Sequence, residues 1–192
     1  MIKTSEISKI RSEMYNKLDA KRYEHTLGVA YTASSLAMRY EVDISKAILA
    51  GLLHDCAKCI NDSKKIKICE TNHIPITEAE RKNPSLLHAK VGSFYAKTKY
   101  GIEDLEILNA ISFHTTGRPD MTDLEKIIYI ADYIEPGRKH LPNLNSIRKT
   151  VFIDIDLALL QILEDTLNYL TSNNSEIDVT TQKTYEFYKN LK

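Results

Sequence analysis

Histidine and aspartate residues stand inside apolar segments of this chain. The dipeptide His54-Asp55 directly follows the mostly apolar stretch Ser45 to Leu53, and Asp132 lies within the apolar run from Ile127 to Ile134. Imidazole and carboxylate groups in such places cost free energy unless they are paired, hydrogen-bonded or bound to a metal. For the dipeptide alone, the simpler interpretation is a helix C-terminus at which His54 meets the helix dipole and Asp55 caps the next turn.

Further histidines strengthen the case for one shared site. His25, His88 and His114 each fall on a separate expected helix. Polar side chains on the apolar sides of several helices indicate a buried site between those helices. Four imidazoles and two carboxylates match the needs of two divalent metal ions, and the lack of thiolates favours iron or manganese over structural zinc. The candidate metal ligands are His25, His54, Asp55, His88, His114 and Asp132. His73, in a polar loop, and His140, in a basic turn, are not included.

The three cysteines raise a second question. Cys56-Ala57-Lys58-Cys59 matches C-x-x-C, but the sequence has no second such pair to complete a zinc site. A thioredoxin-like redox pair needs a preceding strand, whereas Ser45 to Leu53 reads as a buried helix. We therefore interpret Cys56, Cys59 and Cys69 as buried structural thiols, which suits a reducing compartment.

Composition restricts the class of protein. The 192 residues include 26 basic and 26 acidic side chains, so no broad basic field for nucleic acid is expected. Hydrophobic residues make up 43% and charged residues 27%, as in ordinary globular proteins. No apolar run approaches the roughly 20 residues that span a bilayer, and the first residues lack the apolar core of a secretory signal. These features predict a cytoplasmic protein that forms one domain over residues 1–192 and binds neither membrane nor nucleic acid.

The elements that must position the candidate ligands are helices. Apolar residues recur at steps of three and four throughout, with no credible pair of strands, which predicts an all-α fold. Ser45 is the expected N-cap of the central helix, and Thr77–Glu80 and Thr122–Glu125 are expected capping boxes. The expected helices cover residues from about 7 to 18, 22 to 40, 45 to 54, 61 to 69, 84 to 100, 103 to 114, 122 to 135 and 154 to 170, with a last segment after a polar link at 171–176.

The ordered histidines and aspartates resemble a known family. Together with His54-Asp55-Cys56-Ala57-Lys58, His114-Thr115-Thr116-Gly117 and Ala131-Asp132-Tyr133-Ile134-Glu135-Pro136-Gly137-Arg138, they resemble the HD-domain metal-dependent phosphohydrolases. The residues of these motifs most closely resemble those of the YqeK-like branch, the symmetrical bis(5′-nucleosyl)-tetraphosphatases. The resemblance implies an HD-domain helical bundle with a buried dinuclear metal site, a metal-site core over about 22–138, and C-terminal helices over about 154–192.

The resemblance also implies a reaction and roles for residues. The expected reaction is hydrolysis of diadenosine tetraphosphate to two ADP by a hydroxide that two divalent transition metals activate, with iron the family's usual metal and manganese an alternative. His25, His54, Asp55 and Asp132 would hold one metal, and His88 and His114 the other, with Asp55 bridging them. Asp55 and Lys58 would be catalytic. The expected substrate contacts are His25, Asp55, Cys56, Ala57, Lys58, His88, His114, Thr115, Asp132, Arg138, Glu176, Ile177, Asp178, Val179 and Thr180.

Two cations follow expected ligands closely. Lys58 lies three residues after Asp55, where a continuing helical turn would place both on one face, although an exposed lysine at a helix C-terminus is the plain alternative. Arg138 follows a Pro-Gly turn, and its guanidinium suits bidentate phosphate binding. Two other functions stay open, another HD-type nucleotide phosphohydrolase and a nucleotide-binding regulatory module. The oligomeric state is open too, a homodimer included.

Overall fold

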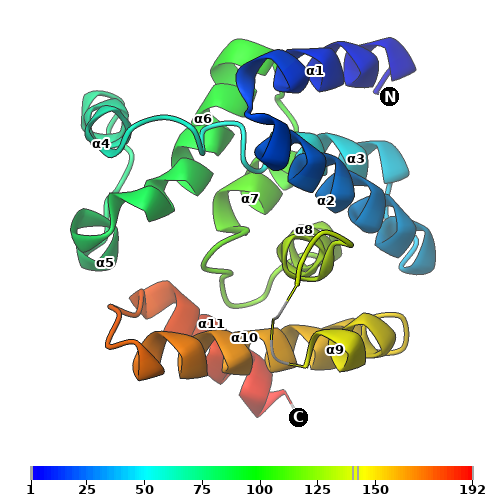
Figure 1. The fold of residues 1–192 in the computed structure, drawn as a ribbon, viewed down its shortest axis with the longest axis vertical. Coiled ribbons are helices and arrows are strands. Elements are labelled where there is room, and N and C mark those ends of the chain that lie inside the picture. The colour runs from blue at the N-terminus through cyan, green and yellow to red at the C-terminus, as the bar shows by residue number, and fades with distance from the viewer. Residues whose placement is uncertain (1, 140, 142, 192) are drawn as a thin grey trace.

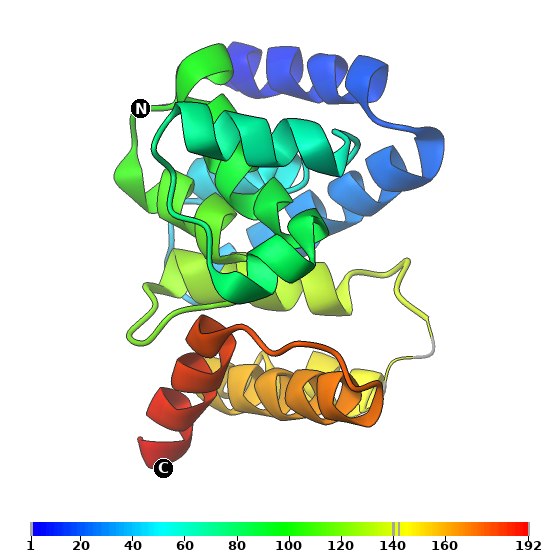
Figure 2. The same ribbon diagram turned by 90° about the vertical axis from the view of Figure 1, so that its left-hand side faces the viewer.

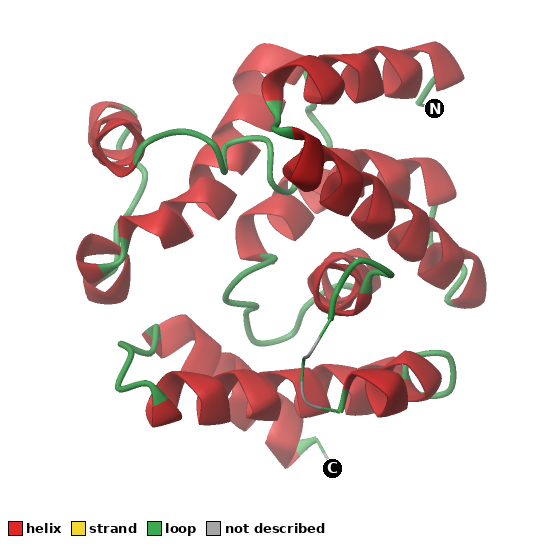
Figure 3. Cartoon of the chain, in the orientation of Figure 1, coloured by secondary structure: helices red, strands yellow, loops and turns green. Residues whose placement is uncertain are grey.

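Helices build the whole described part of the chain. The computed structural model describes residues 2–139, 141 and 143–191, and within them it has no β-strand (Figure 3). The predicted all-α fold is therefore confirmed. The elements are α1 (Thr4–Lys17), α2 (Ala20–Arg39), α3 (Ile44–Leu53), α4 (Asp62–Thr71), α5 (Glu78–Lys82), the 3₁₀ helix η1 (Pro84–Leu87), α6 (His88–Tyr100), α7 (Leu105–Phe113), α8 (Asp123–Ile134), α9 (Leu144–Thr150), α10 (Ile155–Ser172) and α11 (Val179–Asn190).

Polar caps determine where the helices begin. The Thr77–Glu80 and Thr122–Glu125 capping boxes are both present, and Asp154 accepts from the backbone N–H of Leu157 at the start of α10. The prediction of Ser45 as the cap of α3 was wrong. Asp43 caps this helix instead, because its carboxylate accepts from the N–H groups of both Ser45 and Lys46 and satisfies two free donors of the first turn.

Helix α3 is the buried centre of the N-terminal part. Six of its residues are buried, and α2, α7 and α8 pack around it (Figure 1). Helix α2 comes very close to α3 at Gly51, where a Cβ atom would lie 2.7 Å from the Ala30 Cα. Only glycine lets the two backbones meet at this distance. The position of the C-terminal end of α3, and hence of His54, depends on this contact.

A smaller apolar cluster supports the start of α6. Ala57, Cys69, Leu87 and Val91 are buried together where α4 and η1 pack on α6. The predicted helix from Pro84 begins as the 3₁₀ turn η1 and becomes α-helical at His88. The small cluster therefore holds the junction at which His88 lies.

The C-terminal helices α9, α10 and α11 form a layer of their own beneath α8 (Figure 2). The Tyr188 hydroxyl accepts a hydrogen bond from the Met121 N–H at 2.9 Å and ties α11 to the loop before α8. Helix α9 is not among the predicted elements, and α10 extends to Ser172, into the segment predicted as a polar link. No helix among the described residues is both long and apolar enough to cross a membrane.

Candidate metal centre

The six predicted metal ligands converge between the N-terminal helices and α8. His25 lies on α2 and Asp132 on α8, His54 and Asp55 follow the end of α3, His88 begins α6, and His114 follows α7. The four imidazole rings form a continuous series with neighbouring centroids 5.0–5.4 Å apart. Five separate segments therefore bring their polar groups to one place.

Asp55 lies at the centre of this cluster and faces two pairs of histidines. Its Oδ1 lies 3.1 Å from His88 Nε2 and 3.8 Å from His114 Nε2. Its Oδ2 lies 3.5 Å from His54 Nε2 and 3.8 Å from His25 Nε2. The two oxygens of one carboxylate are thus divided between two groups of nitrogen atoms.

The local backbone orients three of the rings in the same way. Each ring places Nδ1 within 2.6–2.7 Å of the carbonyl oxygen three residues earlier, in the pairs His54 with Gly51, His88 with Ser85, and His114 with Ile111. A carbonyl oxygen can only accept, so Nδ1 carries the proton in each pair. In the neutral rings the Nε2 lone pairs then face the centre of the cluster, as in metal-ligating histidines.

His25 is oriented by a carboxylate instead. Its Nδ1 lies 3.1 Å from Glu135 Oε1, and its Nε2 lies 3.0 Å from Asp132 Oδ1. Glu135 is buried, accepts the Gly137 N–H, and fits against Gly28, where a Cβ would lie 2.5 Å from Oε2. Sequence reasoning quoted Glu135 only within a motif and missed this role, because nothing in the sequence spacing relates it to His25.

Several of the possible metal-ligating atoms have no hydrogen-bond partner among the described residues, and a bound metal ion would be that partner. His25 Nε2, His54 Nε2 and Asp55 Oδ1 are buried and make no hydrogen bond within the described part of the chain. His88 Nε2 and His114 Nε2 face each other at 3.1 Å, which brings two lone pairs together when both rings are neutral. Converging lone pairs of this kind are stabilised by a cation between them. Nitrogen and carboxylate donors without thiolate suit divalent transition metals, so these residues fit the metals that the family resemblance implies.

Protonation states also suit metal binding. Burial lowers the pKa of His88 to about 4, so its ring is neutral at pH 7. Burial alone would raise the pKa of Asp55, but His54 and the other imidazoles hold it well below the ordinary range. Asp132 shows the same balance, with burial outweighed by the neighbouring His25, His54 and Arg138, and its pKa is lowered. Metal ligation requires neutral imidazoles and ionised carboxylates.

Three cations surround the cluster. Arg22 Nη1 lies 2.6 Å from Asp55 Oδ2, and Arg138 Nη2 lies 2.6 Å from Asp132 Oδ1. Lys58 Nζ lies 3.2 Å from His88 Nε2, and burial lowers its pKa. The structure therefore brings the predicted residues Lys58 and Arg138 to the site. Arg22 was missed, although its position three residues before His25 on α2 was an available signal.

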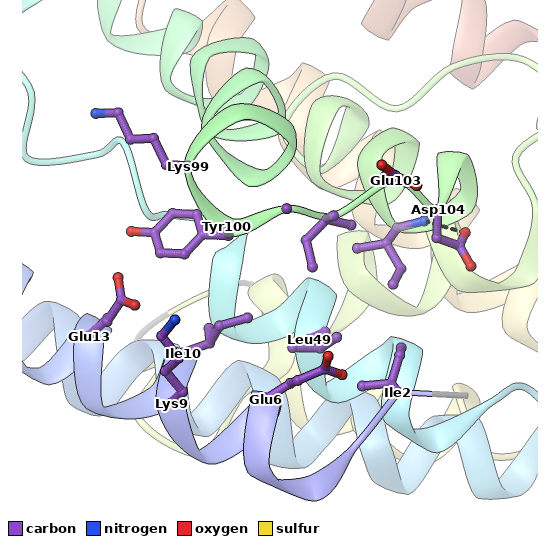
Figure 4. A pocket seen from close by; sticks show the side chains of 13 residues that line it. Ile2, Glu6, Lys9, Ile10, Glu13, Leu49, Lys99, Tyr100, Glu103 and Asp104 are labelled. Carbon is purple, nitrogen blue, oxygen red and sulfur yellow. Dashed lines mark hydrogen bonds between the residues drawn. The ribbon is translucent and has the colours of Figure 1, made fainter.

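A cleft of about 710 Å³ opens beside the cluster, between α2 and the turn after α8. Its lining includes Arg22, His25 and Arg138. A smaller pocket of about 310 Å³ lies elsewhere, between α1 and the connection from α6 to α7 (Figure 4). None of the predicted site residues lines that second pocket, whereas His25 and Arg138 line the cleft beside α2, which therefore belongs to the candidate site.

The predicted C-terminal contacts, residues 176–180, lie beside α5 and do not line this cleft. Asp178 caps α11 and accepts from the Thr77 hydroxyl at 2.6 Å, and Glu176 pairs with Lys82 at 3.0 Å. The Thr184 hydroxyl lies 3.3 Å from the Thr116 carbonyl oxygen and so connects α11 to the turn that contains Thr115. Within this segment, Ile177 and Thr180 are half-buried and Val179 is exposed.

The cysteines do not join the cluster. Cys56 Sγ–H donates to the Gly92 carbonyl at 3.6 Å, and Cys69 is fully buried. The prediction that all three thiols are buried holds fully only for Cys69, because Cys56 is half-buried. Cys59 is exposed, since it lies at the end of the turn after α3 and not in a helix face. The Ala57 side chain is buried in the small cluster, so substrate contact at this residue would come from its backbone. His73 is exposed, and His140 lies outside the described residues.

Comparisons with known proteins agree with this arrangement. The model of the HD domain matches residues 22–137. The chain is 39% identical over 89% of its length to a symmetrical bis(5′-nucleosyl)-tetraphosphatase of Bacillus subtilis, covering 91% of that protein. It is 40% identical over 88% of its length to one of Halalkalibacterium halodurans, covering 89% of it. A crystal structure from Clostridium acetobutylicum, described as an HD superfamily hydrolase involved in NAD metabolism, superimposes with a TM-score of 0.93 at 42% identity, covering 96% of this chain and 97% of that one.

Proposed function

The chain belongs to the HD-domain family, and from this premise we infer that it is a symmetrical bis(5′-nucleosyl)-tetraphosphatase that hydrolyses diadenosine tetraphosphate to two ADP. The observation that carries this conclusion is the similarity to enzymes of that name along about nine-tenths of both chains. The resemblance that the His54-Asp55 and Asp132 motifs predicted is confirmed. We place the reaction at the buried cluster around Asp55.

We further propose how this cluster holds two metal ions. His25, His54, Asp55 and Asp132 would bind one ion, and Asp55, His88 and His114 the second. Support comes from Asp55, whose Oδ2 faces His25 and His54 while its Oδ1 faces His88 and His114. When bound, two divalent ions would supply Lewis acidity that polarises a phosphoryl oxygen and lowers the pKa of a bound water molecule.

Iron is the metal that we propose, with manganese as the alternative. The donor set consists of imidazole nitrogens and carboxylate oxygens, which bind both ions well. Cys56, the thiol nearest in sequence to Asp55, hydrogen-bonds to the Gly92 carbonyl, and burial raises its pKa to about 12. It therefore stays a neutral thiol and is a poor metal ligand.

The cations around the cluster would bind the phosphate chain. Arg22, Lys58 and Arg138 stand beside Asp55, His88 and Asp132. Once Asp55 and Asp132 are neutralised by bound metal, the guanidinium groups of Arg22 and Arg138 would be free to turn toward phosphate oxygens. We also propose that the Cys56-Ala57 turn, Thr115 and the segment 176–180 contact one nucleotide half of the substrate.

Symmetrical cleavage constrains where the phosphates lie. Water must attack the phosphorus second from one adenosine, so that the central P–O–P bond breaks and the bridging oxygen leaves with the other ADP. This phosphorus must then sit over the metal pair, with one nucleoside on each side. Cations at both edges of the cluster suit such a placement, because each charge-assisted contact holds a phosphate at a defined distance from the reacting atom.

Product chromatography tests the assignment. The protein purified without oxygen and supplied with Fe²⁺ or Mn²⁺ should convert diadenosine tetraphosphate to ADP alone. Equal amounts of AMP and ATP would show attack at an outer phosphorus and would overturn the symmetrical assignment. Inorganic phosphate released from nucleoside monophosphates would favour another HD-type phosphohydrolase, and binding without turnover would favour a regulatory module.

A variant of Arg138 tests the phosphate contacts. Arg138→Ala should lower kcat/KM for diadenosine tetraphosphate about ten- to a hundredfold, since one charge-assisted hydrogen bond contributes about 1.5–3 kcal/mol. Metal content, measured by elemental analysis, should stay that of the wild type, because Arg138 itself is no ligand. Arg148→Ala is a matched control, since Arg148 donates to the carbonyl oxygens of Ile134 and Glu135. Equal losses in both variants would argue for a general effect on the turn.

A further inference from the structure

The two halves of a symmetrical substrate need two nucleoside sites, and this inference rests on the proposed function. The segment 176–180, proposed for one half, is anchored to α5 by the pairs Thr77–Asp178 and Lys82–Glu176. The cleft of about 710 Å³ lies instead along α2, and none of the residues 176–180 lines it. In Figure 1 the connection between α10 and α11 lies beside α5 at the lower left, while α2 extends to the right. The residues that line the cleft and the segment 176–180 therefore lie in different parts of the fold.

One end of the cleft is built for phosphate. Arg22, His25 and Arg138 line it, and these residues also contact the Asp55 and Asp132 carboxylates. Lys21 adds a further positive charge to the lining. A diphosphate that leaves the cluster on this side would meet guanidinium groups first. Two carboxylates, Glu24 and Glu135, also line the cleft, and Glu135 is occupied by His25 and the Gly137 N–H.

The other end of the cleft carries an aromatic ring. Tyr31 lines it, together with Leu27 and Gly28. Tyr31 is 54% exposed, so its ring is accessible to a ligand in the cleft. Tyr31 lies six residues after His25 on α2, which places it about 9 Å further along the helix axis. This spacing is comparable with the span from the terminal phosphate to the base in an extended nucleoside diphosphate.

Gly28 lines the cleft between His25 and Tyr31 on α2 and adds no side chain to it. A Cβ there would lie 2.5 Å from Glu135 Oε2, so glycine at this position lets the Glu135 side chain pack directly against the backbone of α2. Glu24, one turn earlier, can accept hydrogen bonds from ribose hydroxyl groups. Cations gather at the His25 end of this groove and an exposed ring lies further along α2, which matches the phosphate and base ends of a nucleotide.

We propose that this cleft binds the second nucleoside diphosphate half of the substrate, with its base stacked on Tyr31. Stacking on an aromatic side chain tolerates different bases because every base has a π-face. The site therefore selects for a nucleobase at the second end of the phosphate chain without reading its identity. It also explains how a chain can hold both products of a symmetrical cleavage.

Tryptophan fluorescence tests the stacking directly. The sequence contains no tryptophan, so Tyr31→Trp introduces a single fluorophore into the cleft. ADP should quench this fluorescence in a saturable way in the metal-loaded protein, because base stacking quenches indole emission. Tyr169→Trp is the matched control, since Tyr169 is 66% exposed on α10 and lines none of the pockets described above. An absence of quenching at Tyr31→Trp, or equal quenching at both positions, would overturn the proposal.

Kinetics and binding give a second measurement. Tyr31→Ala should raise KM for diadenosine tetraphosphate about tenfold, as expected for the loss of one stacking contact, while Tyr31→Trp restores it and Tyr169→Ala has no effect. Calorimetry should find two ADP bound per metal-loaded wild-type chain, and one of these sites weakened in Tyr31→Ala. An unchanged KM together with one ADP per chain would refute the second site. If the wild type instead forms no ADP from the substrate, the proposed function fails, whereas ADP quenching of Tyr31→Trp still reports on the cleft.

Discussion

Asp55 is the residue on which the candidate site depends most. Its two oxygens face different pairs of histidines, and Arg22 provides a further partner at 2.6 Å. The carboxylate is only 3% exposed, so its charge is stabilised by these neighbours and by any bound cation rather than by water. An uncharged residue of the same shape would keep the packing and remove the charge that two cations could share.

We therefore expect Asp55→Asn to lose metal and activity while keeping the fold. Elemental analysis should show fewer than one metal ion per chain, against two in the wild type, and hydrolysis of diadenosine tetraphosphate should fall to background. The circular dichroism spectrum should stay helical. Asp120→Asn is a suitable control, because Asp120 is exposed and its positive φ of 54° is one that asparagine adopts readily. Wild-type turnover in Asp55→Asn would show that this carboxylate does not bridge metals.

Thiol labelling distinguishes the three cysteines. Cys59 is exposed, whereas burial raises the pKa of Cys56 to about 12 and also raises that of Cys69. Since the thiolate is the reactive form, we expect a maleimide to modify one cysteine rapidly at pH 7 and peptide mass spectrometry to locate it at Cys59. Cys59→Ser should remove the rapid phase and keep wild-type metal content and activity. Loss of metal in a folded Cys59→Ser protein would restore the C-x-x-C pair as a metal site.

At the scale of elements, helix ends position the imidazoles. His54 and His114 follow the last residues of α3 and α7, and His88 begins α6. At each of these places a carbonyl oxygen three residues earlier accepts the Nδ1–H and turns Nε2 toward the cluster. Carbonyls near a helix end are free for such bonds because they lack a complete set of partners within the helix. The ring orientation is thus a product of secondary structure.

The contact between α2 and α3 should be sensitive to a single methyl group. In Gly51→Ala the new Cβ would lie 2.7 Å from the Ala30 Cα, and backbone atoms cannot move aside as a flexible side chain would. We expect the free energy of unfolding in urea to fall by about 1–3 kcal/mol. Gly92→Ala is the control, because its Cβ would meet neighbours only at 3.4 Å and beyond. A Gly51→Ala protein as stable as the control would mean that the helices separate at little cost.

At the scale of the whole molecule, the cluster links the N-terminal helices to α8, on which the C-terminal layer rests. Helix α8 contributes Asp132, and α10 packs against α8 from the other side (Figure 2). Folding without metal therefore has to bring neutral imidazoles and ionised carboxylates together in the interior. Stability of the metal-free chain should consequently depend on pH.

His88 determines the direction of this dependence. Its pKa is about 4 in the folded metal-free chain and about 6.5 in an unfolded one, so between these values the unfolded chain binds more protons. The free energy of unfolding in EDTA should be fully developed above pH 6.5 and should fall as the pH decreases toward 4, by up to about 3 kcal/mol. Asp55 stays ionised in this window because its pKa is well below the ordinary range. Urea titrations of wild type and His88→Gln check this expectation, and equal pH profiles of the two would contradict it.

The sequence by itself determined the helical class, most helix boundaries and the six polar residues that cluster. Periodicity depends on the chain alone, and polar groups such as His54-Asp55 and Asp132 are conspicuous within apolar runs. Capping boxes are equally local, and both predicted boxes are present. The family resemblance then supplied the reaction. Such local features can be predicted from the sequence because the residues that cause them lie close together along the chain.

Only the tertiary structure decided which side chains meet across the chain. The pairing of Arg22 with Asp55 joins residues 33 apart, and that of His25 with Glu135 joins residues 110 apart. The exposure of Cys59 and the separation of the α2 cleft from the segment 176–180 likewise depend on how the helices pack. These features follow from close contacts such as Gly51 against Ala30 and Gly28 against Glu135. Spacing along one helix carries no information about such contacts, because the packing of the surrounding helices determines them.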